Sequence, residues 1–304
     1  MIRVLLIGCG DIALRTAELF HGKARLYGLT RRPGEIPKLR GRGIVPIVGD
    51  LDRGASLERL RLAPFAVLHF APPPAQGRDD PRTARLVAAL TKARIIPQRF
   101  VYISTTGVYG DCAGARIDEA RPRRPQTPRA RRRVAAENRL RRWAGRYGVG
   151  LSLLRAPGIY AATRLPLDRI RQATPALRAD EDVFTNHIHA DDLARAVVAA
   201  TFRGRPNRAY KVSDDSELEL GAWLDAIADT FRLPRPPRVS RSEAQARIAP
   251  MLLSFMNESR RLANVRMKRE LRVRLAYPTP HTLLAGLASH PLSRQLALPL
   301  EPAP

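Results

Sequence analysis

The sequence predicts an α/β protein with a doubly wound parallel sheet, followed by a small, mostly helical C-terminal cap. Strand-like apolar runs alternate with helix-like stretches through the first two hundred residues, which is typical of a parallel sheet with helices on both faces. The first run, residues 2–7, is almost continuously apolar, as expected of a strand buried on both faces. After residue 160 the alternation loosens and helical stretches prevail.

Each element of the predicted sheet has its own local pattern. Short apolar runs predict six strands, over residues 2–7, 24–30, 44–48, 66–71, 100–104 and 149–154. Pro46 indicates that the third strand lies at a sheet edge or that a strand starts there, because proline cannot donate to the ladder. Helical spacing of apolar residues predicts the connecting helices, over 11–20, 82–93 and 129–146.

The C-terminal half has a looser organisation. Its pattern predicts a helix over 191–202, a short strand over 209–212, a helix over 218–231, a stiff linker over 233–237 and a basic, partly helical stretch over 241–275. We expect a first domain over residues 1–160, to which 190–213 return. The segments 161–189 and 214–287 would form the cap, and 288–304 a poorly ordered tail.

Composition excludes several classes of protein. Hydrophobic residues make up 44% of the 304 residues and charged residues 27%, which is ordinary for a globular chain. No apolar run reaches the ~18 residues of a membrane-spanning helix, and no secretory signal precedes the first strand. Two cysteines are too few for a disulfide framework and have no metal-ligand spacing. We therefore expect a cytoplasmic protein without membrane association and without a metal.

The charge is unusually positive. The chain has 53 basic and 28 acidic residues, a net charge of +25, and only five of the basic residues are lysines. Between residues 121 and 142, ten arginines accompany a single acidic residue, Glu137. Such clusters attract phosphates, yet no helix-turn-helix, zinc finger or RNA-binding motif accompanies them. Codon bias towards arginine explains the scattered distribution, so we expect no nucleic-acid partner beyond nonspecific attraction.

Residues 8–13 read G-C-G-D-I-A, between the first strand and the first helix. This spacing is typical of a dinucleotide-binding loop. Gly8 would permit the tight turn, and Gly10 would let a diphosphate approach the backbone. Asp11 and Ile12 open the helix, whose N–H groups would face the phosphates, and Ala13 would let the helix pack closely on the sheet. The alternative is a tight turn without a ligand.

The end of the second strand indicates which dinucleotide is bound. NAD-binding folds usually have an acidic residue there, which holds the ribose hydroxyls. This chain instead has Thr30, Arg31 and Arg32. Because guanidinium groups bind phosphate in a bidentate manner, this segment favours NADP over NAD. The alternative is that Arg31 and Arg32 have no role in binding and only reflect the high arginine content of the chain.

Further motifs follow the other predicted strands. They are G-D-L at 49–51, H-F-A-P at 69–72, S-T-T-G-V-Y-G at 104–110, R-A-P-G-I-Y at 155–160 and N-H-I-H-A-D-D-L-A at 186–194. In this combination the chain resembles the extended short-chain dehydrogenase/reductase superfamily, in its NAD(P)-dependent epimerase/dehydratase branch. The resemblance covers residues 1–215, with weaker similarity to about 287. It implies a Rossmann-type fold.

The resemblance also implies roles by position. Cofactor contacts would come from Asp50 and Leu51 beside the adenine, Phe70, Ala71 and Pro72 beside the ribose, Ser104 at the end of its strand, and Pro157 beside the nicotinamide. Thr105 matches the residue whose hydroxyl holds the substrate carbonyl or alcohol. The cap would choose the substrate. The family also allows a homodimer through the helix over 129–146, although its positive charge would oppose pairing.

One departure from the family pattern concerns catalysis. Family members have a tyrosine that passes a proton and, four residues later, a lysine. Here the matching positions are Arg129 and Arg133. Arg133 could still hold a ribose or diphosphate, but Arg129 cannot be a general acid or base near neutral pH. Tyr109 is the nearest alternative proton donor in the sequence, unless it only packs against the sheet edge.

Weaker candidates for the proton donor are Tyr160, His187 and His189. The leading hypothesis is an NADP-preferring oxidoreductase or epimerase-like protein of atypical mechanism, acting on a small carbonyl, alcohol or nucleotide-sugar substrate. A substrate that supplies its own proton would also fit. The alternative is a noncatalytic NADP-binding regulatory protein.

Overall fold

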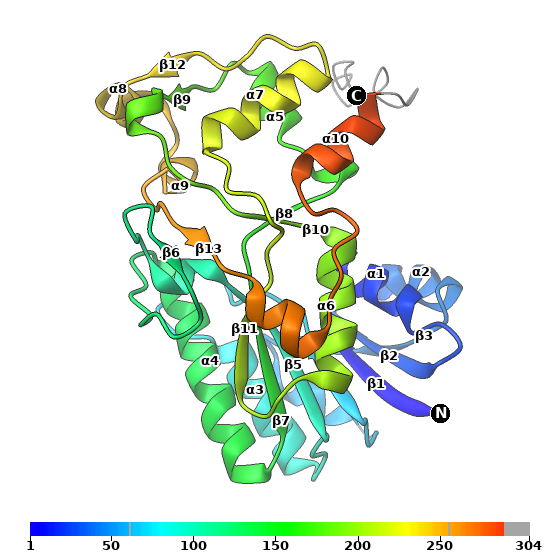
Figure 1. The fold of residues 1–304 in the computed structure, drawn as a ribbon. Helices are drawn as coiled ribbons and strands as arrows, with labels where there is room; N and C mark the ends of the chain where they lie inside the picture. The colour runs from blue at the N-terminus through cyan, green and yellow to red at the C-terminus, as the bar shows by residue number, and fades with distance from the viewer. Residues whose placement is uncertain (61, 255, 289–304) are drawn as a thin grey trace.

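The computed structural model describes residues 1–60, 62–254 and 256–288. Its centre is a seven-stranded sheet with the order β11-β7-β5-β4-β1-β2-β3, in which every pairing is parallel (Figure 1). The strands are β1 (Ile2–Ile7), β2 (Ala24–Thr30), β3 (Ile44–Val48), β4 (Ala66–His69), β5 (Arg99–Thr105), β7 (Gly150–Ala156) and β11 (Arg208–Lys211). This arrangement confirms the predicted Rossmann-type α/β fold.

Helices cover both faces of the sheet. They are α1 (Asp11–Leu19), α2 (Ile36–Gly41), α3 (Pro81–Lys92), α4 (Pro128–Tyr147) and α6 (Ala190–Arg203). Alternate residues of β1 reach opposite faces: Val4 packs with α1 and α6, whereas Leu5 packs with α3 and α4. Both side chains are fully buried. This two-sided burial explains why the first strand is apolar throughout rather than alternating.

Local capping sets where α4 begins and ends. Thr127 accepts a hydrogen bond from the backbone N–H of Ala130 at 3.2 Å, and Pro128 occupies the first helical position. The helix ends at Gly148, whose φ of +67° is readily adopted only by glycine. These caps place the first turns of α4, and therefore Arg129 and Arg133, at the carboxyl edge of β5.

The C-terminal part packs around its own apolar cluster, above the sheet in the view of Figure 1. Its helices are α5 (Leu167–Arg171), α7 (Leu220–Thr230), α8 (Arg241–Arg247), α9 (Pro250–Leu253) and α10 (Pro280–Ala288). Two-residue and three-residue strands tie it together: β6 (Arg116–Ile117) with β13 (Arg261–Leu262), β8 (Gly158–Tyr160) with β10 (His187–His189), and β9 (Ala176–Leu177) with β12 (Arg238–Val239). Short 3₁₀ turns occur at Pro33–Glu35, Gly54–Arg59, Thr106–Tyr109, Ala162–Arg164 and Ala179–Glu181, and a π-helical turn at Met267–Leu271.

The predicted elements differ from the observed ones mainly at their ends. Pro46 lies in β3, which is an edge strand as predicted. The fourth strand ends at His69 rather than at Ala71, because Phe70 and Ala71 both donate their N–H groups to the carbonyl of Ile7 as the chain leaves the sheet. The described residues of the stretch 241–275 form two short helices, a strand and a π-helical turn. The predicted tail falls mostly on 289–304, outside the described residues, and the domain division stays a prediction.

A buried carboxylate lies where β11 passes into the cap. Asp214 is 2% exposed and donates its backbone N–H to the carbonyl of His187. Burial raises its pKa from 3.8 to about 7, although hydrogen bonds from Ser216 oppose the shift. The Tyr160 hydroxyl lies beside the same carboxylate and also opposes the shift. Ionisation of this group therefore costs folding free energy.

We expect Asp214→Asn to raise the Tm by several degrees at pH 8 and to change it little at pH 4. Between pH 3.8 and about 7 the folded protein keeps a proton on Asp214 that the unfolded chain has released. Stability contributed by this group is thus lost as the pH rises through that window. Asparagine has no charge to bury and keeps an oxygen for Ser216. Thermal unfolding across this pH range checks the prediction, which an equal shift at both ends would contradict.

Candidate functional site

The end of β1 and the start of α1 form an open backbone cradle. Gly8 has a φ of +88°, and a Cβ there would lie 2.9 Å from the backbone nitrogen of Ala71. A Cβ on Gly10 would meet no described atom within 4 Å, apart from its chain neighbours. No side chain caps α1, so its first N–H groups face this space. Ala13 is fully buried, and Ile12 packs against the same core, as the motif predicts.

An ion-pair cluster surrounds the first turn of α1. Asp11 pairs with Arg15 at 2.8 Å and with Arg164 of the cap at 3.3 Å. Arg15 also reaches Asp191, at the start of α6, at 2.5 Å. Asp11 would repel an incoming diphosphate, and the two arginines offset that charge. Arg164 thereby links the cradle to the cap.

The end of β2 presents an exposed cationic segment. Thr30 is buried, and its hydroxyl accepts a hydrogen bond from the backbone N–H of Arg32 at 3.2 Å. Arg31 and Arg32 are exposed, and the Arg32 side chain, 72% exposed, lies 3.7 Å from Glu35. Such a distance between exposed groups makes a weak pair. Both guanidinium groups are thus accessible to a ligand.

The neighbouring strand ends complete this rim. Asp50 donates its N–H to the Ser56 hydroxyl at 2.8 Å, and the buried Leu51 accepts from Arg85 through its carbonyl. Phe70 and Ala71 are half-buried and Pro72 is exposed, with its carbonyl 3.1 Å from Arg82. Arg82 also makes a two-pronged contact with Asp52. Because parallel strands end at one edge, the structure brings all of these residues to the edge that carries Gly8.

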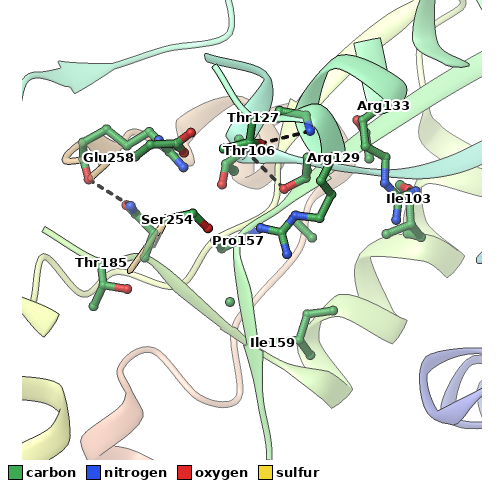
Figure 2. A pocket seen from close by; sticks show the side chains of 18 of the residues that line it. Ile103, Thr106, Thr127, Arg129, Arg133, Pro157, Ile159, Thr185, Ser254 and Glu258 are labelled. Carbon is green, nitrogen blue, oxygen red and sulfur yellow. Dashed lines mark hydrogen bonds and ion pairs between the residues drawn. The ribbon is translucent and has the colours of Figure 1, made fainter. Parts of the chain in front are cut away.

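A cavity of about 400 Å³ continues along this edge beyond β5 (Figure 2). Thr105 lies at its wall, where its hydroxyl accepts the N–H of Gly107 at 3.2 Å. The start of α4 and the turn after β7 form other walls. The lining residues are Ile103, Ser104, Thr105, Thr106, Gly107, Thr127, Arg129, Ala130, Arg133, Ala156, Pro157, Gly158, Ile159, Arg164, Phe184, Thr185, Asn186, Leu220, Ser254, Glu258 and Arg260.

Arg129 and Arg133, which the resemblance predicts to stand at the tyrosine and lysine positions, both line this cavity. Arg133 is held firmly: one guanidinium nitrogen donates to the Tyr102 hydroxyl at 3.0 Å and to the Ile103 carbonyl at 2.6 Å. Its guanidinium also lies over the Tyr102 ring, 5.5 Å from the centroid. Figure 2 shows Arg129 extending from the start of α4 towards Pro157. No tyrosine is among the described residues that line the cavity.

Tyr109 is not among the described residues that line the cavity and lies in a buried charge network. It is 1% exposed, and its hydroxyl accepts a hydrogen bond from Arg155 at 2.8 Å. Burial raises its pKa to about 12, against the opposing effect of Arg155. Ser104 joins the same network by donating to Glu137 at 2.6 Å. Tyr109 is thus placed to stabilise this network rather than to meet a substrate in the cavity.

The weaker candidates also lie outside the lining of this cavity. Tyr160, His187 and His189 form an aromatic cluster between the sheet and the cap. His189 caps α6 by accepting the N–H of Asp191 at 3.2 Å. Burial lowers the pKa of His187 to about 3, so this residue stays neutral at physiological pH.

The sequence does not indicate three of the charged residues that line the cavity: Arg164, Glu258 and Arg260. Arg164 lies in the first cap turn, and the other two precede β13, far along the chain from the strand ends that they meet. No spacing rule singles them out, and in an arginine-rich chain two more arginines carry no signal. Only the packing of the cap onto the sheet edge brings them to Thr105.

The described part of the chain has no helix that is both long and apolar enough to cross a membrane.

A family model described as the NAD dependent epimerase/dehydratase family matches residues 13–213. Among curated proteins, the dTDP-D-glucose 4,6-dehydratase of Homo sapiens is 24% identical over 143 residues. That match spans 44% of this chain and 40% of the human protein, so less than half of that relative is matched.

Solved structures resemble the whole fold. A functionally unknown conserved protein from Silicibacter pomeroyi has a TM-score of 0.78 and 28% identity, over 95% of this chain and 98% of that one. The dTDP-glucose 4,6-dehydratase of Bacillus anthracis, solved in complex with NAD, has a TM-score of 0.76 and 15% identity, over 97% of this chain and 98% of that one. At this identity the second likeness shows the fold alone.

Proposed function

Because this chain belongs to the NAD-dependent epimerase/dehydratase family, we propose that it binds a nicotinamide dinucleotide and acts as an oxidoreductase or epimerase-like enzyme. The proposed substrate is a small carbonyl, alcohol or nucleotide sugar. The human relative, named as a dTDP-D-glucose 4,6-dehydratase, supports the nucleotide-sugar option. The activity of the whole protein is a proposal, because the match covers only 40% of the human relative.

One observation carries the cofactor proposal: the empty space above Gly10 at the uncapped start of α1. A diphosphate needs close approach to the backbone and unpaired N–H groups, and this cradle supplies both. Asp50 and Leu51 would border the adenine, and Phe70 to Pro72 the ribose. When bound, the nicotinamide would supply or accept a hydride.

The reacting end of the site would lie at the wall that carries Thr105. Its hydroxyl would hold a substrate oxygen, and Arg133, pinned by Tyr102 and Ile103, would hold the ribose or a phosphate. Arg129 stays protonated near neutral pH and therefore cannot relay a proton. We infer an atypical mechanism in which the proton comes from another source. The alternative is a noncatalytic NADP-binding regulatory protein. The lack of a tyrosine among the described residues that line the cavity supports this alternative as well.

A turnover assay distinguishes an enzyme from a noncatalytic NADP-binding protein. An enzyme would turn over some member of a panel of carbonyls and nucleotide sugars with NADPH, and Thr105→Val would abolish that turnover. A regulatory protein would bind NADPH without turnover of any of them. Calorimetry with NADPH tests the premise that both share, and the absence of both heat and a thermal shift would remove it.

NADP is the proposed form of the cofactor, because Arg31 and Arg32 are exposed where a 2′-phosphate would lie. We expect the double variant Arg31→Ala and Arg32→Ala to weaken NADPH binding by about 10- to 100-fold and NADH binding far less. The reason is that only NADPH carries the phosphate that these guanidinium groups would bind. Calorimetric titration with each nucleotide gives the ratio.

The matched control removes two other exposed arginines, Arg131 and Arg142 of α4, which changes the net charge equally. This control should leave the ratio of the two affinities unchanged. An equal loss for NADPH and NADH in the Arg31 and Arg32 variant would show that the pair has no role in choosing the cofactor.

A further inference from the structure

An arginine of the cap lies between the dinucleotide cradle and the cavity. Arg164 ends the short turn Ala162–Arg164, which follows β8, and its guanidinium lies 3.3 Å from the carboxylate of Asp11, the first residue of α1. Arg164 also lines the cavity beside Thr105. The cradle and the cavity share one edge of the sheet, so a ligand that extends from the start of α1 towards Thr105 passes beside Arg164.

Only part of the Arg164 guanidinium is used within the protein. Among the described residues, Asp11 is its only side-chain partner, and one nitrogen, Nη1, makes that contact. The Arg164 side chain is 39% exposed, and a pair between two such exposed groups is weak. A guanidinium group has five N–H donors. Most of the donors of Arg164 are therefore available to a ligand, and Asp11 does not hold the side chain tightly.

The charge at the start of α1 depends on Arg164. Asp11 and Asp191 share Arg15, whose guanidinium lies 2.8 Å from the first carboxylate and 2.5 Å from the second. Two carboxylates and one guanidinium leave a net negative charge, which would repel a diphosphate in the cradle. Arg164 neutralises this cluster. Because both carboxylates hold Arg15, Arg164 is the cation of the cluster that can turn towards an incoming phosphate.

We propose that Arg164 is a cofactor-binding residue supplied by the cap, which binds a phosphate of the dinucleotide at the start of α1 while it keeps its contact with Asp11. The planar fork of a guanidinium lets one nitrogen hold a carboxylate while another binds a phosphate. The backbone N–H groups of α1 would hold the diphosphate from the helix, and Arg164 would add a charged contact from the cap. This inference rests on the proposed function, because it takes a dinucleotide to occupy the cradle.

The contact would couple the cofactor to the cap. Arg164 donates its backbone N–H to the carbonyl of Ala161 at 2.9 Å, which fixes the turn that carries the side chain. A phosphate bound by Arg164 would therefore immobilise this turn as well as the start of α1. Since Arg164 also lines the cavity, the dinucleotide would complete the wall against which a substrate binds.

Calorimetric titration of the full chain with NADPH tests the contact. We expect Arg164→Gln to weaken NADPH binding about tenfold, because a charge-assisted hydrogen bond to a phosphate is lost. The matched control is Arg178→Gln, which removes another exposed arginine of the cap, one that lies 3.7 Å from the carboxylate of Glu243. It changes the net charge equally and should bind NADPH like wild type. Unchanged affinity in Arg164→Gln would overturn the inference and leave the proposed function standing.

A second background separates direct binding from charge compensation. If Arg164 only offsets the charge of Asp11, Arg164→Gln should cost nothing in a chain that already carries Asp11→Asn. If Arg164 binds the phosphate itself, the loss of about tenfold should persist in that background. A loss that disappears with Asp11→Asn would therefore overturn the inference. Thermal unfolding without nucleotide verifies that each variant is folded, as expected for substitutions of exposed side chains.

Hydrogen exchange measures the coupling to the cap. In wild type, NADPH should slow amide exchange in residues 8–13 and also in residues 161–165. Arg164→Gln at saturating NADPH should keep the first protection and lose the second. Equal protection of 161–165 in both proteins would contradict the contact. If NADPH protects neither segment and gives no heat, the cradle is not a dinucleotide site, and the proposed function fails together with this inference.

Discussion

Replacing Gly10 with alanine is expected to weaken NADPH binding by about 10- to 100-fold while leaving the fold intact. The added Cβ meets no described atom within 4 Å beyond its chain neighbours, and the backbone there (φ −80°, ψ −171°) accepts any residue. The substitution should therefore leave the stability of the fold unchanged. A bound diphosphate, however, must approach this backbone closely, and a clash with one methyl group costs about 1–3 kcal/mol.

Calorimetry measures the affinity, and thermal unfolding without nucleotide measures the stability. Gly145→Ala is the matched control, because its Cβ also meets nothing within 4 Å but lies on α4. It should keep NADPH affinity and raise the Tm slightly, since alanine favours helix. Gly8→Ala should instead lower the Tm, because of its φ of +88° and its contact with Ala71. Wild-type NADPH affinity in Gly10→Ala would mean that the diphosphate lies elsewhere.

The sheet could be predicted from the sequence because its signals are local. Each strand is a short apolar run, and the motifs that end the strands meet at one edge once the sheet is parallel. The same reasoning predicts Gly10 and Thr105 at one edge, and in the structure α4 carries Arg129 and Arg133 into the cavity. The strand ends could not be predicted as accurately, because they depend on contacts with other strands. For example, β4 ends where Phe70 and Ala71 donate their N–H groups to the carbonyl of Ile7 in β1.

Side-chain direction and long-range contacts could not be predicted in this way. Tyr109 follows Thr105 by only four residues, yet the turn after β5 sends its ring into the core, where Arg155 meets it. Arg260 reaches the site through a hydrogen bond to Gly110, 150 residues earlier in the chain. Neither contact follows from periodicity. Both depend on how segments far apart in the sequence pack together, which is a property of the folded molecule.

The buried network behind the cavity is expected to contribute strongly to stability. Glu137 is fully buried and accepts hydrogen bonds from Arg155 at 2.7 and 3.0 Å, as well as from Ser104. Burial alone would raise its pKa, but the hydrogen bonds and the charge of Arg155 hold the pKa below its usual value. The pair ties α4 to β7 and supports Ser104 at the end of β5. It therefore fixes the wall on which Thr105 lies.

We expect Glu137→Ala to lower the free energy of unfolding by about 3–5 kcal/mol at neutral pH. The reason is that Arg155, itself 3% exposed, would be left as a buried charge without its partner. Denaturant unfolding measures the change. The loss should shrink progressively as the pH falls below the glutamate pKa of the unfolded chain towards the lower pKa of folded Glu137, because the unfolded wild-type chain takes up a proton that the folded protein does not yet bind. Glu18→Ala, which removes an exposed glutamate paired with Arg42, should have little effect.

A double variant separates the charge from the packing. If the uncompensated guanidinium of Arg155 causes the loss, replacing Glu137 and Arg155 together with leucine should be less destabilising than Glu137→Leu alone, since the buried charge of Arg155 is removed with its partner. If lost packing were the cause, the two substitutions would add. The hydroxyl of Tyr109 would lose its Arg155 donor in the double variant, so recovery should be incomplete. Additive losses would contradict an electrostatic role for the pair.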